Sequence, residues 1–289
     1  MTNTSHDGRR TALVTGGTGG IGRAVAQDLA RRGHRVIIVG RDADAGRDVL
    51  AGLDRDGHEM VRGDLSLLRD TARVAAEVTA RTDRLDAVVL CAGVFAAAPE
   101  WTDEGLERTL VVNYLSRHLL LRLLLPLVTR APSGRVVLVA NAGRYPDTLD
   151  LDDLQMRRGG RGLRVAGRTQ FANDLLAVDL AEELRDTRVR VFCVFPGVVD
   201  TDVFRNARGV PRPLRAVAVT LQRRIGAAPS QAARTPVFLA DDPTATSGFY
   251  GPNVRPLPIP ARAQNPDRRA ALRAAADDVI RDWLTPTRS

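Results

Sequence analysis

Five short apolar runs, rich in β-branched residues, alternate along the chain with longer stretches of helical periodicity. The runs have the composition of strands buried on both faces, and they cover residues 12–14, 36–39, 87–90, 136–139 and 189–194. The stretches between them repeat their apolar residues every three or four positions, at 23–32, 66–81, 105–128 and 169–184. Such alternation produces βαβ units, which right-handed crossovers join into a doubly wound sheet. We therefore expect one α/β domain around a parallel sheet.

The 289 residues suffice for one large domain, and no repeat or low-complexity linker divides them. We expect a flexible tail at 1–9, a domain at 10–260, and a C-terminal helix and tail at 261–289. Residues 203–229 are basic and contain proline, which favours a lid over a substrate site. The longest apolar stretch, 119–128, is interrupted by Arg122, and residues 1–8 lack the apolar core of a signal peptide. The sequence therefore predicts no membrane span and a cytoplasmic protein.

The positive charge of the chain comes entirely from arginine. All 42 basic residues are arginines, so chemistry that needs an ε-amine is excluded. They are scattered among 34 acidic residues without interleaved aromatic residues, and we expect no nucleic-acid partner. Cys91 and Cys193 lie in apolar runs, where a small buried hydrophobe is the expected role. No cluster has metal-ligand spacing, so no metal is expected.

A glycine-rich turn follows the first predicted strand and precedes the first predicted helix. Its sequence is Thr15-Gly16-Gly17-Thr18-Gly19-Gly20-Ile21-Gly22. Glycines in a strand-to-helix turn let the backbone approach a pyrophosphate, while the helix N-terminus offers free N–H groups. The turn therefore predicts a dinucleotide site.

The ends of the next two strands indicate which dinucleotide binds. Arg41 can pair with the 2′-phosphate of NADP, whereas an acid at this position would bind the 2′-hydroxyl of NAD. NADP(H) is the predicted cofactor, and the neighbouring Asp42 keeps NAD(H) open as an alternative. Asp64, in Gly63-Asp64-Leu65, is expected at the end of a further strand that precedes the helical stretch 66–81, where it either meets the adenine or caps the helix that follows.

These residues resemble the short-chain dehydrogenase/reductase family. Besides the glycine turn and Asp64, the resemblance rests on Cys91-Ala92-Gly93, Asn113 and Pro196-Gly197-Val198-Val199-Asp200-Thr201. The segments Val112-Asn113-Tyr114-Leu115, Leu151-Asp152-Asp153-Leu154 and Phe171-Ala172-Asn173 resemble more narrowly its retinol-dehydrogenase and protochlorophyllide-reductase branch. The resemblance spans residues 10–250 and implies a Rossmann fold with a nicotinamide cofactor. It also implies a homodimer or homotetramer built on the helices containing Asn113 and Asn173.

The resemblance further implies which residues contact the cofactor. They are Gly16, Thr18, Gly20, Ile21, Gly22, Arg41, Asp64, Leu65, Ala92, Gly93, Asn113, Gln170, Pro196, Gly197, Val199 and Thr201.

The catalytic positions depart from the family pattern. The family uses a serine at the end of the fifth strand, and a tyrosine four residues before a lysine in the next helix. Alignment of the motifs places Asn141, Ala166 and Gln170 at these positions, while Asn113 is retained. A shift of register cannot restore the motif because the chain has no lysine. Loss of a general acid costs about 10²–10⁴-fold in rate, so ordinary carbonyl reduction is not expected.

Other polar residues remain in the predicted substrate cleft. Asn141 and Tyr145 are the leading catalytic candidates beside Asn113, and their alternative roles are to end a strand and to pack a turn. Arg144 and Arg168 could neutralise an acidic substrate or an enolate, with Asp147 as a base, or all three could be solvated. His118 follows Tyr114 by one helical turn and is expected in a core or an interface.

Three functions are compatible with these residues. The first is an NADP(H)-binding enzyme that tailors a bacterial secondary metabolite by a redox-neutral cyclisation, dehydration or isomerisation. The second is an NADPH-dependent oxidoreductase of an activated acceptor, such as an iminium, a quinone or an enone. The third is a non-enzymatic NADP(H) sensor or partner protein. Both enzymatic functions imply a small-molecule substrate.

Overall fold

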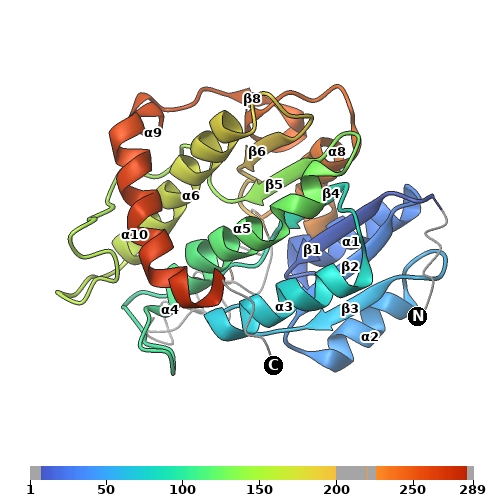
Figure 1. Cartoon of the computed structure of the whole chain (residues 1–289), viewed down its shortest axis with the longest axis horizontal. Coiled ribbons are helices and arrows are strands. Elements are labelled where there is room, and N and C mark those ends of the chain that lie inside the picture. The colour runs from blue at the N-terminus through green and yellow to red at the C-terminus, as the bar shows by residue number, and fades with distance from the viewer. Residues whose placement is uncertain (1–7, 200–219, 221–225, 285–289) are drawn as a thin grey trace.

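The fold is built on one eight-stranded sheet with the strand order β3-β2-β1-β4-β5-β6-β7-β8. All neighbouring strands run parallel except β7 and β8. The computed structural model describes residues 8–199, 220 and 226–284. Most of the predicted lid at 203–229 therefore lies outside the described residues, as do residues 1–7 and 285–289. The doubly wound α/β fold is confirmed (Figure 1).

Each of the five predicted strands is present, within a residue or two of its expected bounds. They are β1 (Thr11–Thr15), β2 (Arg35–Gly40), β4 (Ala87–Leu90), β5 (Arg135–Val139) and β6 (Arg190–Val194). The sheet is completed by β3 (Glu59–Arg62), β7 (Gly248–Tyr250) and β8 (Pro256–Leu257). These three strands carry no long β-branched run because they lie toward the edges of the sheet, where less of each strand is buried.

Helices cover both faces of the sheet and form two apolar cores. On one face lie α1 (Gly20–Arg31), α2 (Ala43–Ala51) and α8 (Pro229–Asp241). On the other lie α3 (Leu68–Arg81), α4 (Arg108–Leu110), η1 (Val111–Leu115), α5 (Ser116–Thr129), α6 (Leu163–Glu183) and α10 (Pro266–Leu284). Successive residues of β1 enter opposite cores, Ala12 and Val14 the first and Leu13 the second. This alternation is what a strand buried on both faces requires.

The predicted helix at 105–128 is interrupted by a wider turn. The π-helical turn η1 joins α4 to α5 and places Asn113 at its centre. Single π-helical turns within α-helices are frequent at functional sites. Residues Arg108–Thr129 are the one described segment with the length and composition of a membrane span, and 78% of its most apolar window is buried inside the protein.

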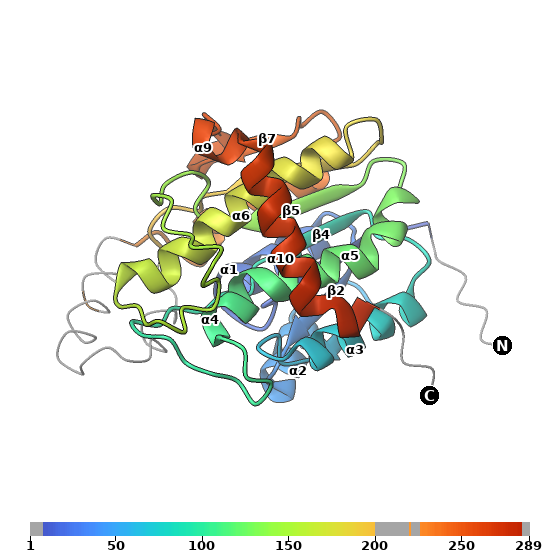
Figure 2. The ribbon, with the colours of Figure 1, turned by 60° about the vertical axis from the view of Figure 1, so that its left-hand side comes forward.

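The C-terminal helix α10 lies across α5 and α6, with its beginning near α9 (Ala261–Gln264) (Figure 2). It buries Leu272, Ala276 and Ile280 against that layer. Its Asp277 Oδ1 lies 2.7 Å from His118 Nε2, and its Arg273 Nη1 lies 2.9 Å from Asp179 Oδ2 of α6. α10 therefore covers part of the outer face of α5.

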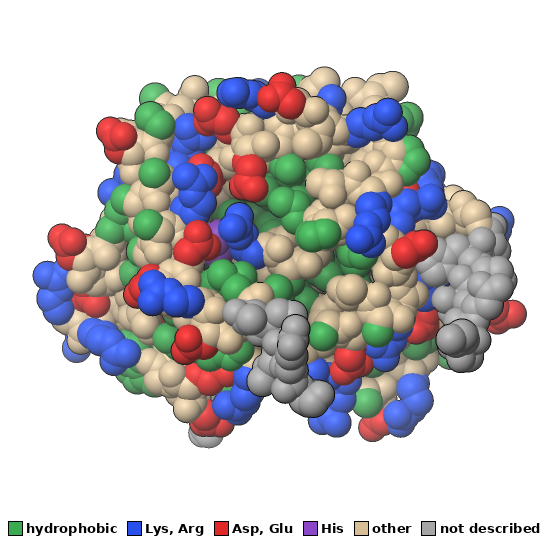
Figure 3. All heavy atoms as spheres, viewed as in Figure 1, with side chains coloured by type: hydrophobic (Ala, Val, Ile, Leu, Met, Phe, Trp, Pro, Cys, Tyr) green, Lys and Arg blue, Asp and Glu red, His purple; other side chains and the backbone are tan. Residues whose placement is uncertain are grey.

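A small hollow remains where α5 and α6 meet beside α10. Figure 3 shows hydrophobic side chains gathered on this face of the molecule. The hollow is lined by Leu121, Leu125, Leu176 and Leu180, and by charged side chains that include Arg122 and Glu183. The structure of the single chain does not test the predicted homodimer or homotetramer, which stays a prediction.

Candidate functional site

The glycine turn between β1 and α1 is tightly closed. Gly16 and Gly20 adopt φ angles of +66° and +51°, which disfavour any side chain. A Cβ atom on Gly22 would lie 2.3 Å from the carbonyl oxygen of Gly16. A Cβ atom on Gly19, in contrast, would meet open space. Gly19 is the N-cap of α1 and no side chain caps that end, so the first N–H groups of the helix remain available to a ligand.

A pocket of about 150 Å³ opens beside this turn, at the carboxyl ends of β1 to β4. Seven of the residues predicted to bind the cofactor line it: Gly16, Thr18, Arg41, Asp64, Leu65, Ala92 and Gly93. The sequence reasoning missed seven others: Val39, Gly40, Gly63, Ser66, Val94, Arg108 and Val112. The pocket lies where parallel α/β sheets bind their ligands, in the crevice at the strand ends.

Arg41 and Asp42 have separate partners at the end of β2. The Asp42 carboxylate caps α2, because its Oδ1 accepts hydrogen bonds from the backbone N–H groups of Asp44 and Ala45 at 2.9 and 3.1 Å. The Arg41 side chain is exposed and lines a second depression together with Arg62. Arg62 Nε also donates to the carbonyl oxygen of Arg41 at 3.1 Å. Two guanidinium groups therefore border the place where a 2′-phosphate is predicted.

Asp64 is fixed locally rather than left free. Its Oδ1 accepts hydrogen bonds from Ser66 N at 3.0 Å and from Ser66 Oγ at 2.8 Å. Its backbone N–H donates to Asp70 Oδ2. Asp64 thus shapes the turn before α3 and lines the pocket. Its expected role as a helix cap is wrong, because α3 begins after Leu67 and the N–H groups of Leu68 and Arg69 donate to Glu104.

Asn113 joins η1, α6 and the loop after β4. Its Nδ2 donates to Val94 O at 3.0 Å and to Thr169 Oγ1 at 3.2 Å, and its Oδ1 accepts from Val94 N at 2.8 Å. Asn173 Nδ2 donates to the carbonyl oxygen of Asn113 at 2.8 Å. The amide of Asn113 is therefore fully engaged within the protein.

A buried arginine lies beneath this network. Arg117 is 4% exposed and donates to Asn173 Oδ1 at 3.1 Å and to the carbonyl oxygens of Ala92 and Val139 at 2.8 and 3.0 Å. Burial lowers the pKa of Arg117 to about 10 and raises the pKa of the nearby Cys91 thiol to about 12. The Arg117 guanidinium therefore remains a cation at neutral pH. It places a positive charge behind the ends of β4 and β5.

Residues 10–148 match the short chain dehydrogenase family. Human retinol dehydrogenase 14 is 31% identical over 261 residues, which cover 83% of this chain and 77% of that protein. Mouse polyprenol dehydrogenase is 34% identical over 244 residues, with coverage of 81% and 72%. The chain belongs to the short chain dehydrogenase family.

Two solved structures share this short chain dehydrogenase fold over most of their length. An uncharacterized protein from Mycobacterium paratuberculosis superposes with a TM-score of 0.73 and 25% identity, covering 94% of this chain and 93% of that one. The RhlG/NADP active-site complex of Pseudomonas aeruginosa superposes with a TM-score of 0.65 and 27% identity, covering 84% and 94%.

The position aligned with the serine of short chain dehydrogenases lies in a strained loop after β5. Asn141 is half-buried there, and Ala142 and Gly143 follow with φ angles of +38° and +79°. Asp174 of α6 holds the loop, because its two carboxylate oxygens accept from Gly143 N at 3.1 and 3.0 Å. Burial raises the pKa of Asp174 to about 6. Sequence reasoning missed Asp174, which lies 31 residues from its partner.

The residues predicted to replace the family's tyrosine and lysine, Ala166 and Gln170, lie on α6 and are small or uncharged. Ala166 is buried, and Gln170 has its Oε1 buried without a hydrogen-bond partner among the described residues. Tyr145 approaches the same turn of α6, since a Cβ atom on Gly167 would lie 3.1 Å from Tyr145 Cδ1. Burial raises the pKa of the Tyr145 phenol, so it is protonated at neutral pH. The predicted packing role of Tyr145 is therefore present, next to the position aligned with the family's tyrosine.

Two of the charged candidates are engaged elsewhere. Arg168 is 1% exposed and forms a buried ion pair of 2.5 Å with Glu107 Oε2, so its expected role toward a substrate is wrong. Asp147 pairs with Arg268 at 2.7 Å and is not a free base. Arg144 lies over the ring of Phe195, with its Cζ atom 4.9 Å from the ring centre. The role of Arg168 was wrongly predicted because its partner Glu107 lies 61 residues away, and no local pattern in the sequence reveals the pair.

The predicted segment after β6 begins beside β7. Phe195 N donates to Tyr250 O at 2.8 Å, and Pro196 and Gly197 follow, with Gly197 at a φ of +87°. Val199 forms a bridge to Ala227. Thr201 lies outside the described residues, so its predicted contact with the cofactor is not addressed by the structure.

Proposed function

We propose that this chain is an NADP(H)-dependent oxidoreductase that reduces an activated, conjugated acceptor without a tyrosine–lysine acid. The observation that carries the proposal is a preserved cofactor cradle in a chain that contains no lysine. Gly19 faces open space beside the uncapped start of α1, and Gln170 presents an unpartnered oxygen where a nicotinamide ribose is expected. These features fit a dinucleotide. The NADP complex of the related RhlG structure supports the same cofactor.

Arg41 supports NADP(H) over NAD(H). Its guanidinium is exposed, whereas the Asp42 carboxylate that could have bound a ribose hydroxyl is used to cap α2. Charge-assisted hydrogen bonds from an arginine to a phosphate are among the stronger polar contacts. We therefore assign the 2′-phosphate to Arg41, with Arg62 beside it.

The remaining polar groups suit a substrate whose reduction needs little acid. A reduced nicotinamide supplies hydride when it is bound. Addition of that hydride to the β-carbon of a conjugated carbonyl leaves the charge on oxygen as an enolate, a much weaker base than the alkoxide formed from a simple ketone. The Asn141 amide and the Tyr145 hydroxyl could donate hydrogen bonds to this oxygen, and solvent could supply the proton. Arg117 adds a positive charge behind the strand ends.

The names of the relatives point to isoprenoid substrates, namely retinol and polyprenol. In both alcohols a carbon–carbon double bond adjoins the carbinol carbon, so the corresponding aldehydes are conjugated. A conjugated isoprenoid carbonyl is therefore our proposed substrate class. The redox-neutral tailoring of a bacterial secondary metabolite remains an alternative, favoured by the absence of the family's tyrosine and lysine at positions 166 and 170.

Isotope transfer tests the proposal. The protein is incubated with NADPH deuterated at C4 and with citral, a conjugated isoprenoid aldehyde. Menadione, a quinone, is tested separately by oxidation of NADPH, because deuterium transferred to a quinone exchanges with water. We expect the deuterium that leaves C4 of the nicotinamide to appear at C3 of the product, citronellal. No deuterium in citronellal and no oxidation of NADPH by menadione, with NADPH still bound, would favour the redox-neutral function or the sensor. Failure to bind either nucleotide would overturn the proposal.

A further inference from the structure

Another cavity opens at the amino ends of the central strands, whereas the cofactor pocket lies at their carboxyl ends. It has a volume of about 310 Å³ and lies where β1, β4 and β5 begin. Its lining includes the charged residues Arg10, Arg84, Asp86, Arg135 and Asp241, together with Ser133. The cofactor turn follows the other end of β1, so the two sites are separated by the length of the sheet.

Arg135 is the unusual member of this lining. It is the first residue of β5 and is 2% exposed, yet its Nη2 is buried without a hydrogen-bond partner. No carboxylate among the described residues lies within ion-pair distance of its guanidinium. Its cross-strand neighbour on β6 is another arginine, Arg190. Burial and the like charges of Arg190 and Arg10 lower the pKa of Arg135. A buried and unpaired cation next to like charges destabilises a fold.

The two carboxylates of the cavity are already neutralised. Asp241 accepts from Arg10 and also pairs with Arg32 Nη1 at 3.0 Å. Asp86 pairs with Arg84 Nε at 3.1 Å. The third carboxylate nearby, Asp242, accepts instead from Thr244 N at 2.7 Å. Arg135 therefore has no ion-pair partner among the described residues, although the Asp242 carboxylate offsets part of its charge at longer range.

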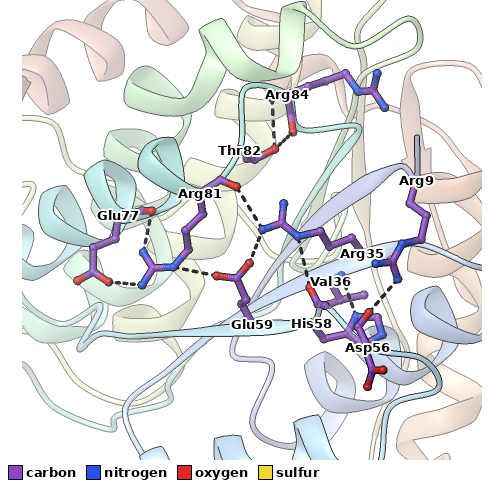
Figure 4. Close-up of polar contacts among 11 residues, drawn as sticks. Arg9, Arg35, Val36, Asp56, His58, Glu59, Glu77, Arg81, Thr82 and Arg84 are labelled. Carbon is purple, nitrogen blue, oxygen red and sulfur yellow. Dashed lines mark hydrogen bonds and ion pairs between the residues drawn. The ribbon is translucent and has the colours of Figure 1, made fainter. Parts of the chain in front are cut away.

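Another strand of the same sheet begins with an arginine that has an ion-pair partner, although its Nη1 is also buried without a hydrogen bond. Arg35 is the first residue of β2, as Arg135 is of β5. Figure 4 shows Arg35 between the carboxylate of Glu59 and the main-chain oxygen of Arg81, and Arg81 in turn between Glu59 and Glu77. Each of those guanidinium groups meets an acid. Among the described residues, no carboxylate occupies the place beside Arg135 that Glu59 occupies beside Arg35.

We propose that this cavity binds a small oxyanion, a phosphate or a carboxylate, with Arg135 as its principal ligand. Arginine binds both groups through paired N–H donors. Arg10, Arg84 and the Ser133 hydroxyl border the same space and supply further donors, and Pro132, Pro243 and Ala240 supply apolar walls. The bound anion removes the electrostatic cost of Arg135. The site is independent of the oxidoreductase proposal because it shares no residue with the cofactor pocket.

Thermal unfolding of the full chain saturated with NADPH tests the site. Inorganic phosphate and acetate are each compared with chloride at matched ionic strength. We expect one of the two oxyanions to raise Tm above the value in chloride, which also identifies the ligand class. Arg135→Met should abolish that shift and weaken binding of the same anion at least tenfold in calorimetry. Arg122→Met, a change of an exposed arginine on α5, is the matched control and should retain the shift.

A second variant guards against loss of folding in Arg135→Met. Ser133→Asp places a carboxylate at the rim of the cavity, where it can neutralise Arg135 within the chain. We expect a higher Tm in chloride and no further response to the oxyanion. The proposal would be overturned if the unmodified protein had the same Tm in phosphate and in acetate as in chloride. A response that persists in both Arg135→Met and Ser133→Asp would also overturn it.

Discussion

Arg41 and Asp42 decide the cofactor preference at the scale of single residues. We expect Arg41→Gln to weaken NADP(H) binding about tenfold or more, because it removes a charge-assisted contact worth about 1.5–3 kcal/mol. NAD(H) binding should be unchanged. Asp42→Ala should instead lower the free energy of unfolding by about 1 kcal/mol, the cost of a lost helix cap, without changing the preference. Calorimetric titration with both nucleotides measures the first effect, and urea unfolding measures the second. Equal affinities of the unmodified protein for NAD(H) and NADP(H) would contradict the role of Arg41.

Asn141 and Tyr145 are the residues proposed to replace the family's serine and tyrosine. Asn141→Ala and Tyr145→Phe should each reduce kcat at least tenfold, about 1.4 kcal/mol of transition-state stabilisation, while the Kd for NADPH stays unchanged. Tyr145→Phe keeps the ring that packs on Gly167, so it separates the hydroxyl from the packing. Full turnover in both variants would mean that the two side chains are only structural.

At the scale of elements, the contact between α6 and the loop after β5 is predicted to depend on pH. Asp174 has its pKa raised to about 6 by burial, above its value in the unfolded chain. Its protonated form therefore favours folding, and that contribution is present at pH 4 and lost as the pH rises through about 6. We expect the stability of the unmodified protein, measured relative to Asp174→Asn, to fall by up to about 3 kcal/mol over this range.

Urea unfolding between pH 4 and pH 8 measures this difference. The exposed Asp186→Asn is the matched control and should show no such trend. A difference between the unmodified protein and Asp174→Asn that does not vary with pH would contradict the assignment.

The elements that could be predicted from the sequence are those whose burial leaves a pattern. β1, β2, β4, β5 and β6 are buried on both faces and carry continuous β-branched runs. β7 and β8 have three and two residues, too few for any periodicity. The helix α8 was missed because Pro236 lies inside it and it follows the segment interpreted as a lid.

The candidate site divides in the same way. The glycine turn could be predicted because its chemistry is local: Gly22 must lack a side chain to lie against Gly16. The partners of Arg168 and Asp174 could not, because each contact joins residues that only the tertiary fold brings together. Arg108 lines the cofactor pocket, and Arg62 lines the depression beside Arg41. Both were missed for a related reason, since the position of the element that carries each residue was not known.

At the scale of the whole molecule, α10 covers part of the surface of α5 and α6, the helices through which a homodimer or homotetramer is predicted. A chain that ends at Gln264 loses α10 and exposes the side chains against which Leu272, Ala276 and Ile280 pack. We expect this shortened chain to self-associate at micromolar concentration, because an exposed apolar patch of this kind seeks a partner. The predicted homodimer or homotetramer on α5 and α6 would place a second copy at the hollow lined by Leu125, so Leu125→Arg in the intact chain should lower the mass.

Light scattering of the three proteins measures the outcome. An unchanged mass in Leu125→Arg would contradict association through the hollow beside α10. A shortened chain that stays monomeric would contradict the covering role of α10.

The central claim is that this short chain dehydrogenase works without a tyrosine–lysine acid and so requires an activated acceptor. The most direct measurement compares NADPH oxidation with citral and with citronellal, which differ only in the conjugated double bond. Our account predicts a kcat/KM for citral at least a hundredfold above that for citronellal, a factor drawn from the usual contribution of a general acid, about 10²–10⁴. Equal and rapid oxidation of NADPH with the saturated aldehyde would contradict the account, because it would require an acid that neither Asn141 nor Tyr145 explains.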